Sequence, residues 1–234
     1  HGRLDIKEIK PIFAYYKEAN LVSVSDSQRT PLSDANWVAT VYHGIRMPDY
    51  PLGRGNGGYL AFLGRICPEK RPDLAIEIAK RAGCKLKIAA KVDKIDLDYF
   101  KEHIEPLLDH PLVEFMGEID EEHKKDFLGD ALALLFPIDW PEPFGLVMVE
   151  AMACGTPVIA CPCGSVPEVV VEGLTGFIGT TVEELAQAVQ LVDRIDREAC
   201  RNYIEQTFSD KVMTDNYERV YYSLLRFPKK AASF

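Results

Sequence analysis

The stretch DWPEPFGLVMVEAMACGTPVIA, residues 139–160, decides the fold because it joins a loop, a helix and a strand in immediate succession. A short apolar run at Ala131–Phe136 precedes it, and the length of that run and its end at Pro137 predict a fully buried strand. Two prolines in the next residues, Trp140–Pro143, disfavour helix, so we predict a loop there. This loop is expected at the carboxyl end of the buried strand.

The second half of the stretch is predicted to be a buried helix followed by another strand. The composition of residues 144–154 suits a helix, Gly155 is placed to end it, and Pro157 begins a short apolar strand. Almost every side chain of this helix is apolar, which is typical of a buried helix. Glu150 is its single charged residue, and a buried carboxylate must be hydrogen-bonded or paired because its desolvation otherwise costs several kcal/mol.

Glu142 places a second carboxylate in the loop, eight residues before Glu150. If the helix begins near Phe144, its N-terminus lies between the two carboxylates. A helix N-terminus presents free N–H groups and a positive partial charge, which makes it a ready site for phosphate. The implied ligand is anionic in the middle and rich in hydroxyl groups at both ends, which describes a nucleotide-sugar. Two carboxylates in unrelated ion pairs are the alternative interpretation.

The spacing Glu142-x7-Glu150 in EPFGLVMVEAMACGTPVIA resembles the signature of retaining glycosyltransferases of family 4 (group 1), which have the GT-B fold. The similarity extends to GYLAFLGRICPEKRPDLAIEIA at Gly58–Ala79, to GSVPEVVVEGLTGFI at Gly164–Ile178 and, more loosely, to VSVSDSQR and VYHGI near the start. It covers most of residues 58–178. The combined pattern is specific, whereas any one piece is a weak signal.

A loop after the predicted strand Tyr59–Leu63 carries two cations. We expect Gly64 to permit a tight exit from the strand, so that Arg65 and Lys70 can converge on one anion before a helix that Pro72 opens. Two cations at a diphosphate stabilise the negative charge that grows on it as the sugar leaves. The resemblance implies the same role for this pair. Ordinary solvated cations on a surface loop are the alternative.

The resemblance implies contacts for the rest of the donor. Glu142 would hold the transferred sugar, and Glu150 would accept hydrogen bonds from the ribose hydroxyls. Gly117, after a predicted strand at Val113–Met116, allows close approach of the nucleobase. Gly164–Ser165 either adds backbone contacts or forms a simple turn. The remaining implied contacts are those of the N–H groups of Phe144, Gly145 and Leu146 to phosphate and sugar, and of Gly117 and Ile119 to the base.

The regular alternation of strands and helices from Tyr59 onward predicts an α/β fold with a doubly wound parallel sheet, in which ligands bind at the carboxyl ends of the strands. We expect strands at Tyr59–Leu63, Lys85–Ala90, Val113–Met116, Ala131–Phe136, Pro157–Ala160 and Gly176–Ile178, and helices at Pro72–Ala82, Leu97–Leu108, Glu121–Gly129, Phe144–Cys154, Val166–Val171, Thr181–Ile195, Asp196–Phe208 and Asp210–Phe227.

Four segments are expected along the chain. Residues 1–46 contain too few strands for an independent sheet, and the resemblance implies a fragment of an N-terminal, acceptor-binding domain whose greater part is missing. An appendage on the main sheet is the alternative. Residues 47–57 form a hinge linker, whose GxGxxG pattern lacks the strand and helix of a dinucleotide site and is assigned to flexible linkage. Residues 58–208 bind the nucleotide-sugar, and residues 209–234 form a C-terminal helix.

The composition excludes several classes of partner. A net charge of -9 argues against a nucleic-acid backbone, which calls for basic patches. No apolar run reaches the length that spans a bilayer. The six cysteines lack disulfide-scaffold spacing and any C-x-x-C pair, so reduced thiols and a cytoplasmic location are expected. The chain begins at His1 rather than Met, which we interpret as a part of a longer protein.

Two short patterns suggest metal ligands, and we predict neither a metal nor a cofactor. Cys161-Pro-Cys163 has no nearby second pair or histidine. Asp96-x-Asp98 resembles the metal-binding pair of the other large class of glycosyltransferases, yet it opens a predicted helix, where first-turn acids act as caps. The nucleoside diphosphate sugar is therefore treated as a substrate.

The resemblance implies an enzyme that moves a sugar from a nucleoside diphosphate donor to a hydroxyl acceptor with retention of configuration. Because the acceptor domain is expected to be missing, we predict that this chain alone binds nucleotide and is inactive. A noncatalytic nucleotide-binding or interaction module, and a GT-B epimerase or phosphorylase, are the alternatives. The base, sugar, acceptor and oligomeric state stay open.

Overall fold

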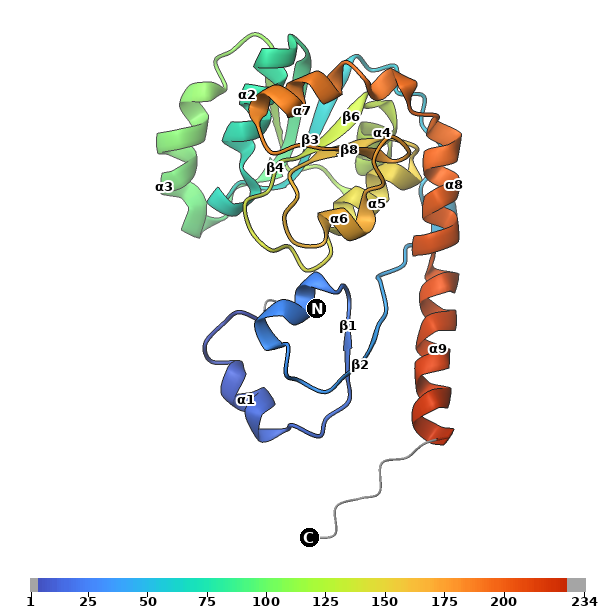
Figure 1. Ribbon diagram of the computed structural model, residues 1–234. Coiled ribbons are helices and arrows are strands. Elements are labelled where there is room, and N and C mark those ends of the chain that lie inside the picture. Colours follow the sequence, from blue (N-terminus) through green and yellow to red (C-terminus); the bar gives the residue numbers. More distant parts are fainter. Residues whose placement is uncertain (1–3, 227–234) are drawn as a thin grey trace.

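The computed structural model describes residues 4–226 and contains a six-stranded parallel sheet with helices on both faces (Figure 1). Its strands are β3 (Tyr59–Arg65), β4 (Lys85–Lys91), β5 (Val113–Gly117), β6 (Ala133–Phe136), β7 (Val158–Ala160) and β8 (Gly176–Ile178). Across the sheet they follow the order β5, β4, β3, β6, β7, β8. The predicted doubly wound parallel sheet is confirmed, because all neighbouring strands in it are parallel and helices connect them.

Two hydrophobic layers enclose the sheet. One layer is contributed by α2 (Pro72–Ala82) and α7 (Val182–Val189), and the other by α4 (Glu121–Asp130), α5 (Leu146–Ala153) and α8 (Arg197–Phe208). Alternate residues of the strands point into each layer, so that Leu60 and Phe62 join the first and Ala61 the second. Burial on both faces explains why these strands appear in the sequence as continuous apolar runs.

Local signals fixed several element bounds correctly. The prediction for α2 is confirmed at both ends, because Pro72 starts the helix and Gly83, with φ 66°, ends it in the left-handed conformation. A capping box is present at the start of α7: the Thr181 side chain accepts from the Glu184 N–H, and the Glu184 carboxylate accepts from the Thr181 N–H. These caps need only neighbouring residues, which the sequence displays directly.

Other predicted helices were too long. The helix expected at Leu97–Leu108 consists of α3 (Leu97–Tyr99), a π-helix at Phe100–Ile104 and a 3-10 turn at Glu105–Leu107, because Pro106 has no N–H to continue the pattern. The helix expected at Phe144 begins at Leu146, after Gly145 in the left-handed conformation. The other differences are a split of residues 181–195 into α7 and a turn at Val192–Arg194, and a shorter α6 (Val166–Val169). In the N-terminal segment, α1 spans Lys10–Tyr15.

The predicted flexible role of the linker glycines is wrong. The Gly53 N–H donates to the Cys154 carbonyl at 2.9 Å, and the Gly55 N–H donates to the Gly129 carbonyl at 3.0 Å. A Cβ added at Gly53 would lie 2.1 Å from the Gly129 oxygen. The glycines therefore allow two backbone segments to approach closely, and the linker is pinned to the sheet domain.

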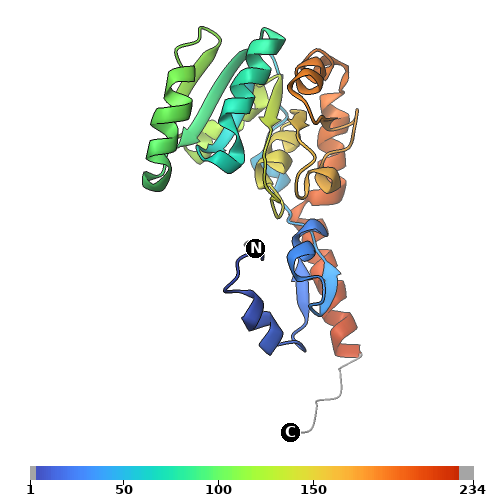
Figure 2. The same cartoon turned by 60° about the vertical axis from the view of Figure 1, so that its left-hand side comes forward.

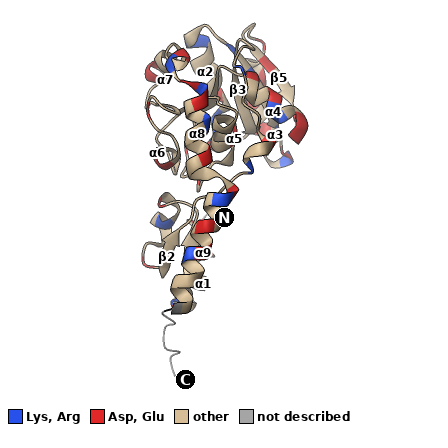
Figure 3. Ribbon diagram, turned by 90° about the vertical axis from the view of Figure 1, so that its right-hand side faces the viewer, with Lys and Arg blue, Asp and Glu red and all other residues tan. Residues whose placement is uncertain are grey.

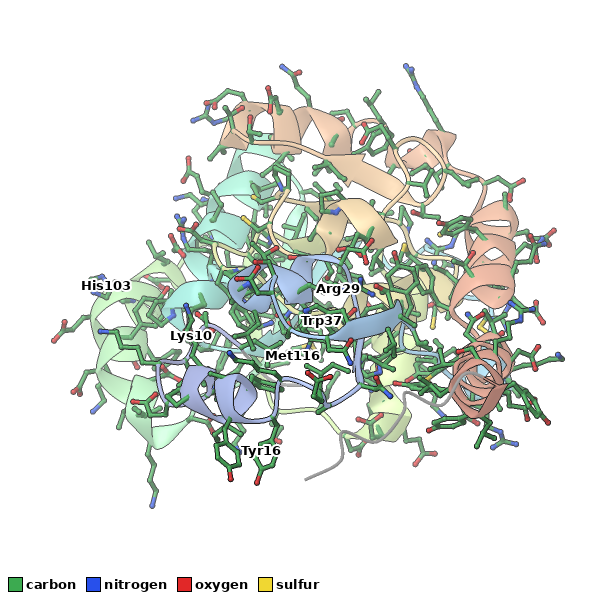
Figure 4. All side chains as sticks on the ribbon, turned by 60° about the horizontal axis from the view of Figure 1, so that its bottom comes forward. Lys10, Tyr16, Arg29, Trp37, His103 and Met116 are labelled. Carbon is green, nitrogen blue, oxygen red and sulfur yellow. The ribbon has the colours of Figure 1, made fainter. Side chains whose placement is uncertain are left out.

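The N-terminal unit, residues 4–46, contains its own two-stranded parallel sheet of β1 (Leu21–Ser23) and β2 (Trp37–Thr40), apart from the main sheet (Figure 2). The strands of this unit therefore do not extend the main sheet. The Arg29 guanidinium lies over the Trp37 ring at 5.7 Å (Figure 4). Glu168 of α6 ties the unit to the sheet domain, because its carboxylate accepts from the Asp26 N–H at 2.7 Å and the Ser27 N–H at 2.8 Å.

The last helix, α9 (Asp210–Arg226), continues from α8 and runs beside the N-terminal unit (Figure 3). The Asp210 N–H donates to the Ile45 carbonyl at 2.9 Å, which fixes the helix start at the linker. Tyr221, Tyr222 and Leu225 of this helix are exposed. The predicted end at Phe227 lies outside the described residues. No helix within residues 4–226 combines the length and apolarity needed to cross a bilayer.

Leu134 of β6 is completely buried at the centre of the sheet. We predict that Leu134→Ala lowers the free energy of unfolding by about 2–5 kcal/mol, through lost burial and the cavity left behind. Urea denaturation followed by circular dichroism measures this change. The control is Leu225→Ala, whose side chain is 75% exposed and which should change stability by less than about 0.5 kcal/mol. Equal losses in the two variants would contradict the assigned core.

Candidate functional site

The sheet reverses its winding between β3 and β6. From β3 the chain adds β4 and β5 on one side of β3, and it then crosses to add β6, β7 and β8 on the other side of β3. In open α/β sheets the loops beyond such a switch point diverge and leave a crevice that binds ligands. The loops that follow these two strands are residues 66–71 and 137–145. They are tied together by the Asp139 N–H, which donates to the Glu69 carbonyl at 3.0 Å.

Lys70 and Glu142 meet at this crevice. The Lys70 ammonium donates to the Glu142 carboxylate, and the side chains are 24% and 15% exposed. The Lys70 nitrogen also lies 5.4 Å from the Phe136 ring centre and 5.5 Å from the Trp140 ring centre. Aromatic faces attract a cation and restrict where it moves. The structure thus brings together two residues that the sequence placed at one site, and adds an aromatic cradle that the sequence analysis missed.

Arg65 has different partners from Lys70. Its guanidinium lies 3.9 Å from Glu69, 3.7 Å from Asp93 and 3.5 Å from Asp96. The predicted convergence of Arg65 and Lys70 on one partner is therefore not seen among the described residues. The predicted capping role of Asp96 is wrong, because its side chain caps no N–H at the start of α3 and instead faces Arg65.

Glu150, in the middle of α5, is held by partners from two distant segments. Its Oε1 accepts from the Lys124 ammonium at 2.9 Å and from the Tyr50 hydroxyl at 2.9 Å. The side chains of Lys124 and Glu150 are only 12% and 14% exposed. Burial lowers the pKa of Lys124, but hydrogen bonds to Glu121 and Glu150 outweigh it and raise the pKa overall. Burial and the Glu150 charge raise the pKa of Tyr50, which keeps its hydroxyl a donor.

Each carboxylate of the sequence motif is thus ion-paired, and the two pairs are separate. The alternative of two unrelated ion pairs agrees with the structure in this respect. Lys124 and Tyr50 were missed by the sequence analysis. The sequence analysis predicted that a buried Glu150 needs a partner, but Lys124 lies 26 residues away in the sequence and Tyr50 lies 100 residues away. No local pattern identifies such partners.

The loop before α5 is fixed by a second loop. The Ser165 N–H donates to the Glu142 carbonyl at 3.0 Å, and the Ser165 hydroxyl donates to the Phe144 carbonyl at 2.8 Å. A Cβ at Gly164 would lie 2.4 Å from the Glu142 backbone nitrogen, and Gly164 has φ 58°. Gly164–Ser165 is therefore more than a simple turn, because its contacts hold the motif loop in position.

The residues at the helix start differ in exposure. Phe144 is buried, with its ring centre 5.8 Å from that of Phe208 and 5.0 Å from that of His43. Burial lowers the pKa of His43. Gly145 has φ 76°, which an L side chain rarely adopts, and Leu146 is 45% exposed. Gly145 therefore makes the turn between the Glu142 loop and α5, an eight-residue helix whose first N–H groups come directly after this loop.

Three further predicted residues line the same edge. Gly64 does not form the predicted exit turn, because it lies inside β3 and pairs with Ala90 of β4. Gly117 ends β5 with φ 72°, and Ile119 packs partly against the core. A Cβ at either Gly64 or Gly117 would meet nothing within 4 Å, so both positions face open space. Both therefore leave the sheet edge open to a ligand.

The metal-ligand patterns form no larger cluster in the part of the chain that the structure describes. Cys161 and Cys163 are free thiols, and no group of three or more His, Cys, Asp and Glu side chains within residues 4–226 suits a metal ion. Burial raises the pKa of Cys161 to about 11. His103 lies exposed at the periphery beyond α3 (Figure 4).

The pair of Lys124 and Glu150 provides a test of this geometry. Lys124→Met leaves a buried carboxylate without its cation, so we predict a loss of about 3 kcal/mol in the free energy of unfolding. Combining it with Glu150→Gln removes the stranded charge, and the double variant should be more stable than the sum of the single losses implies. Urea denaturation of all four proteins at pH 7 measures the coupling. Strictly additive losses would contradict the pairing.

The chain is similar in sequence to glycosyltransferases. N-acetyl-alpha-D-glucosaminyl L-malate synthase of Bacillus anthracis is 35% identical over 123 residues, which are 49% of this chain and 32% of that protein. D-inositol 3-phosphate glycosyltransferase of Mycobacterium marinum is 29% identical over 178 residues, which are 74% of this chain and 38% of that protein. The chain therefore spans less than half the length of these relatives.

The structure is similar to solved glycosyltransferases. Anabaena Alr3699/HepE in complex with UDP and glucose superposes with a TM-score of 0.79 at 20% identity, over 92% of this chain and 66% of that chain. Sucrose-phosphate synthase from Thermosynechococcus elongatus superposes with a TM-score of 0.79 at 20% identity, over 92% of this chain and 61% of that chain. This likeness confirms the predicted fold, the Rossmann-like sheet of a GT-B glycosyltransferase.

The family is shown by the sequence itself. Residues 52–209, more than half of the 234 residues, match the family described as "Glycosyl transferases group 1". The match begins in the linker and ends at the junction of α8 and α9, so it includes both ion pairs of the motif. The chain therefore belongs to the group 1 glycosyl transferases.

Proposed function

We propose that this chain is the donor-binding part of a glycosyltransferase that moves a sugar from a nucleoside diphosphate to a hydroxyl acceptor, with retention of configuration. The observation that carries the proposal is the pair of Lys70 and Glu142 at the β3/β6 switch point, directly before the start of α5. A cation, a carboxylate and free helix N–H groups there match a diphosphate joined to a sugar. Retention rests on the family resemblance alone.

Each part of the donor has a proposed partner. Lys70 leaves Glu142 and binds the diphosphate, which frees the Glu142 carboxylate to accept from hydroxyls of the transferred sugar. Glu150 accepts from the ribose hydroxyls. The N–H groups of Phe144, Gly145 and Leu146 face phosphate and sugar, Gly64 leaves room beside them, and Gly117 and Ile119 border the nucleobase.

Arg65 requires a change of partner to take part. Its guanidinium is half-exposed among the carboxylates of Glu69, Asp93 and Asp96. A diphosphate carries enough negative charge to compete for this cation, and a bidentate contact to phosphate is stronger than single contacts to acids. We therefore assign to Arg65 the second cation, which stabilises the departing diphosphate.

The comparisons guide the choice of ligand and the description of the whole protein. HepE was crystallised with UDP, so UDP is the first nucleotide to test here. We propose that the rest of the enzyme supplies the acceptor site and that closure of two domains excludes water. Residues 1–46 would be the end of that other domain, and residues 47–57 would be the hinge linker, which stays with the sheet domain because Gly53 and Gly55 are hydrogen-bonded to it. A cytoplasmic location is also proposed, supported by six free thiols.

A noncatalytic binding module is the second candidate. It is favoured by the finding that both motif carboxylates are already satisfied by cations of the chain itself. Such a module would show no turnover of any nucleotide-sugar even with the complete protein. A GT-B epimerase or phosphorylase is separated from a transferase by identifying the product.

Calorimetric titration with UDP, GDP and ADP tests donor binding. We predict that one of them binds and that Lys70→Ala weakens its binding by about 1.5–3 kcal/mol, or roughly 10-fold to 100-fold, because a charge-assisted contact is lost. The control is Lys80→Ala, an exposed lysine on α2 away from the crevice. Unchanged affinity in Lys70→Ala would contradict the role of Lys70.

The isolated chain is expected to lack transferase activity, because the proposed acceptor site lies in a domain that it does not contain. The measurement is release of free nucleotide from a sugar donor in the presence of candidate acceptors. Multiple turnovers by these 234 residues would contradict the proposal that the acceptor site lies in another domain.

A further inference from the structure

We propose that Tyr50 is a positioning residue for donor binding: its hydroxyl, presented by the linker, orients the Glu150 carboxylate toward the ribose. This inference rests on the proposed role of Glu150 in binding nucleoside diphosphates. It adds a residue outside the sheet domain to the site. It also links the donor site to the segment that joins the two units of the chain.

Both protein donors approach the same oxygen of Glu150. The Tyr50 hydroxyl and the Lys124 ammonium each lie 2.9 Å from Oε1. Neither of these contacts occupies Oε2, which is left to accept from a ligand hydroxyl. A terminal carboxylate torsion is broad and roughly two-fold when nothing restrains it. Two donors on one oxygen select a single orientation of the group, and this is the orientation we assign to ribose binding.

Tyr50 is itself held firmly at its other end. It is 9% exposed, and its main-chain carbonyl accepts from the Arg201 guanidinium of α8. The same guanidinium donates to the Ala153 carbonyl at the end of α5, and to the Met47 carbonyl at 3.3 Å. Arg201 thus fastens the linker to the helix that carries Glu150. Tyr50 thus has its main chain fixed near the end of α5 and its hydroxyl fixed at Glu150 in the same helix.

The ring and the hydroxyl have separable roles. The ring packs in the core beside the Lys124 ammonium, which lies 6.0 Å from the ring centre. A phenylalanine at this position keeps that packing and removes only the hydrogen bond to Glu150. With Lys124 as its sole remaining donor, the carboxylate gains freedom to rotate. Ribose binding then has to fix the orientation of the Glu150 carboxylate, which the Tyr50 hydroxyl fixes in the native chain.

The test compares Tyr50→Phe with Tyr59→Phe in calorimetric titrations with UDP and with 2′,3′-dideoxy-UDP. Tyr59 is a matched control, because it is 6% exposed and its hydroxyl donates to the Phe127 carbonyl at 2.8 Å, away from Glu150. We expect Tyr50→Phe to weaken UDP binding roughly fivefold, as for one hydrogen bond, and to leave dideoxy-UDP binding unchanged. Tyr59→Phe should change neither.

A second arm excludes a general structural effect. In the Glu150→Gln background, Tyr50→Phe should have no additional effect on UDP affinity, because the charged group that Tyr50 orients is gone. Thermal denaturation of both tyrosine variants establishes that each is folded at the titration temperature.

The outcomes separate this inference from the proposed function. If the unaltered chain binds none of UDP, GDP and ADP, the donor-binding function fails and the role of Tyr50 fails with it. If the unaltered chain prefers UDP but Tyr50→Phe binds both nucleotides as the unaltered chain does, the function stands and the inference is overturned. Equal weakening of both nucleotides by Tyr50→Phe overturns it as well, because the effect then has no connection to the ribose.

Discussion

The central constraint on this structure is the buried Glu150 carboxylate, which needs a cation and hydrogen-bond donors from other segments of the chain. Glu150 lies on a helix that is otherwise apolar, and its side chain is 14% exposed. An unpaired carboxylate at such a position costs several kcal/mol, so the fold must bring a cation to it. Lys124 from the preceding helix and Tyr50 from the linker meet that need. Three segments far apart in the sequence are thereby locked around one carboxylate.

The winding of the sheet determines where the second carboxylate can act. The strand order reverses between β3 and β6, so the loops that follow these two neighbouring strands border one crevice. Lys70 on one loop pairs with Glu142 on the other across this crevice. Loop geometry then refines the site. Gly145 allows the left-handed turn into α5, and Gly164 lets a neighbouring loop press against the Glu142 backbone. Under the proposed function, a ligand would meet a preformed edge in which only charged side chains need to exchange partners.

The sequence predicted the parallel sheet, since apolar runs, prolines and glycines are local signals, and the family resemblance placed Lys70 and Glu142 at one site. It failed where the outcome depends on distant contacts. The linker glycines appeared to be flexible, but Gly53 packs against Gly129, a residue 76 positions away (129 − 53). Arg65 was expected beside Lys70 and instead faces Asp93 and Asp96. Charge partners across a crevice follow from the packing of whole elements, which no short window of sequence contains.

The central claim is that a diphosphate binds between Lys70 and the start of α5. A crystal structure of this chain with bound UDP tests it most directly. The account predicts a phosphate oxygen within hydrogen-bond distance of the Lys70 ammonium and of a backbone N–H among residues 144–146, with Glu142 released from Lys70. A diphosphate bound elsewhere, with the Lys70 and Glu142 pair intact, would contradict it.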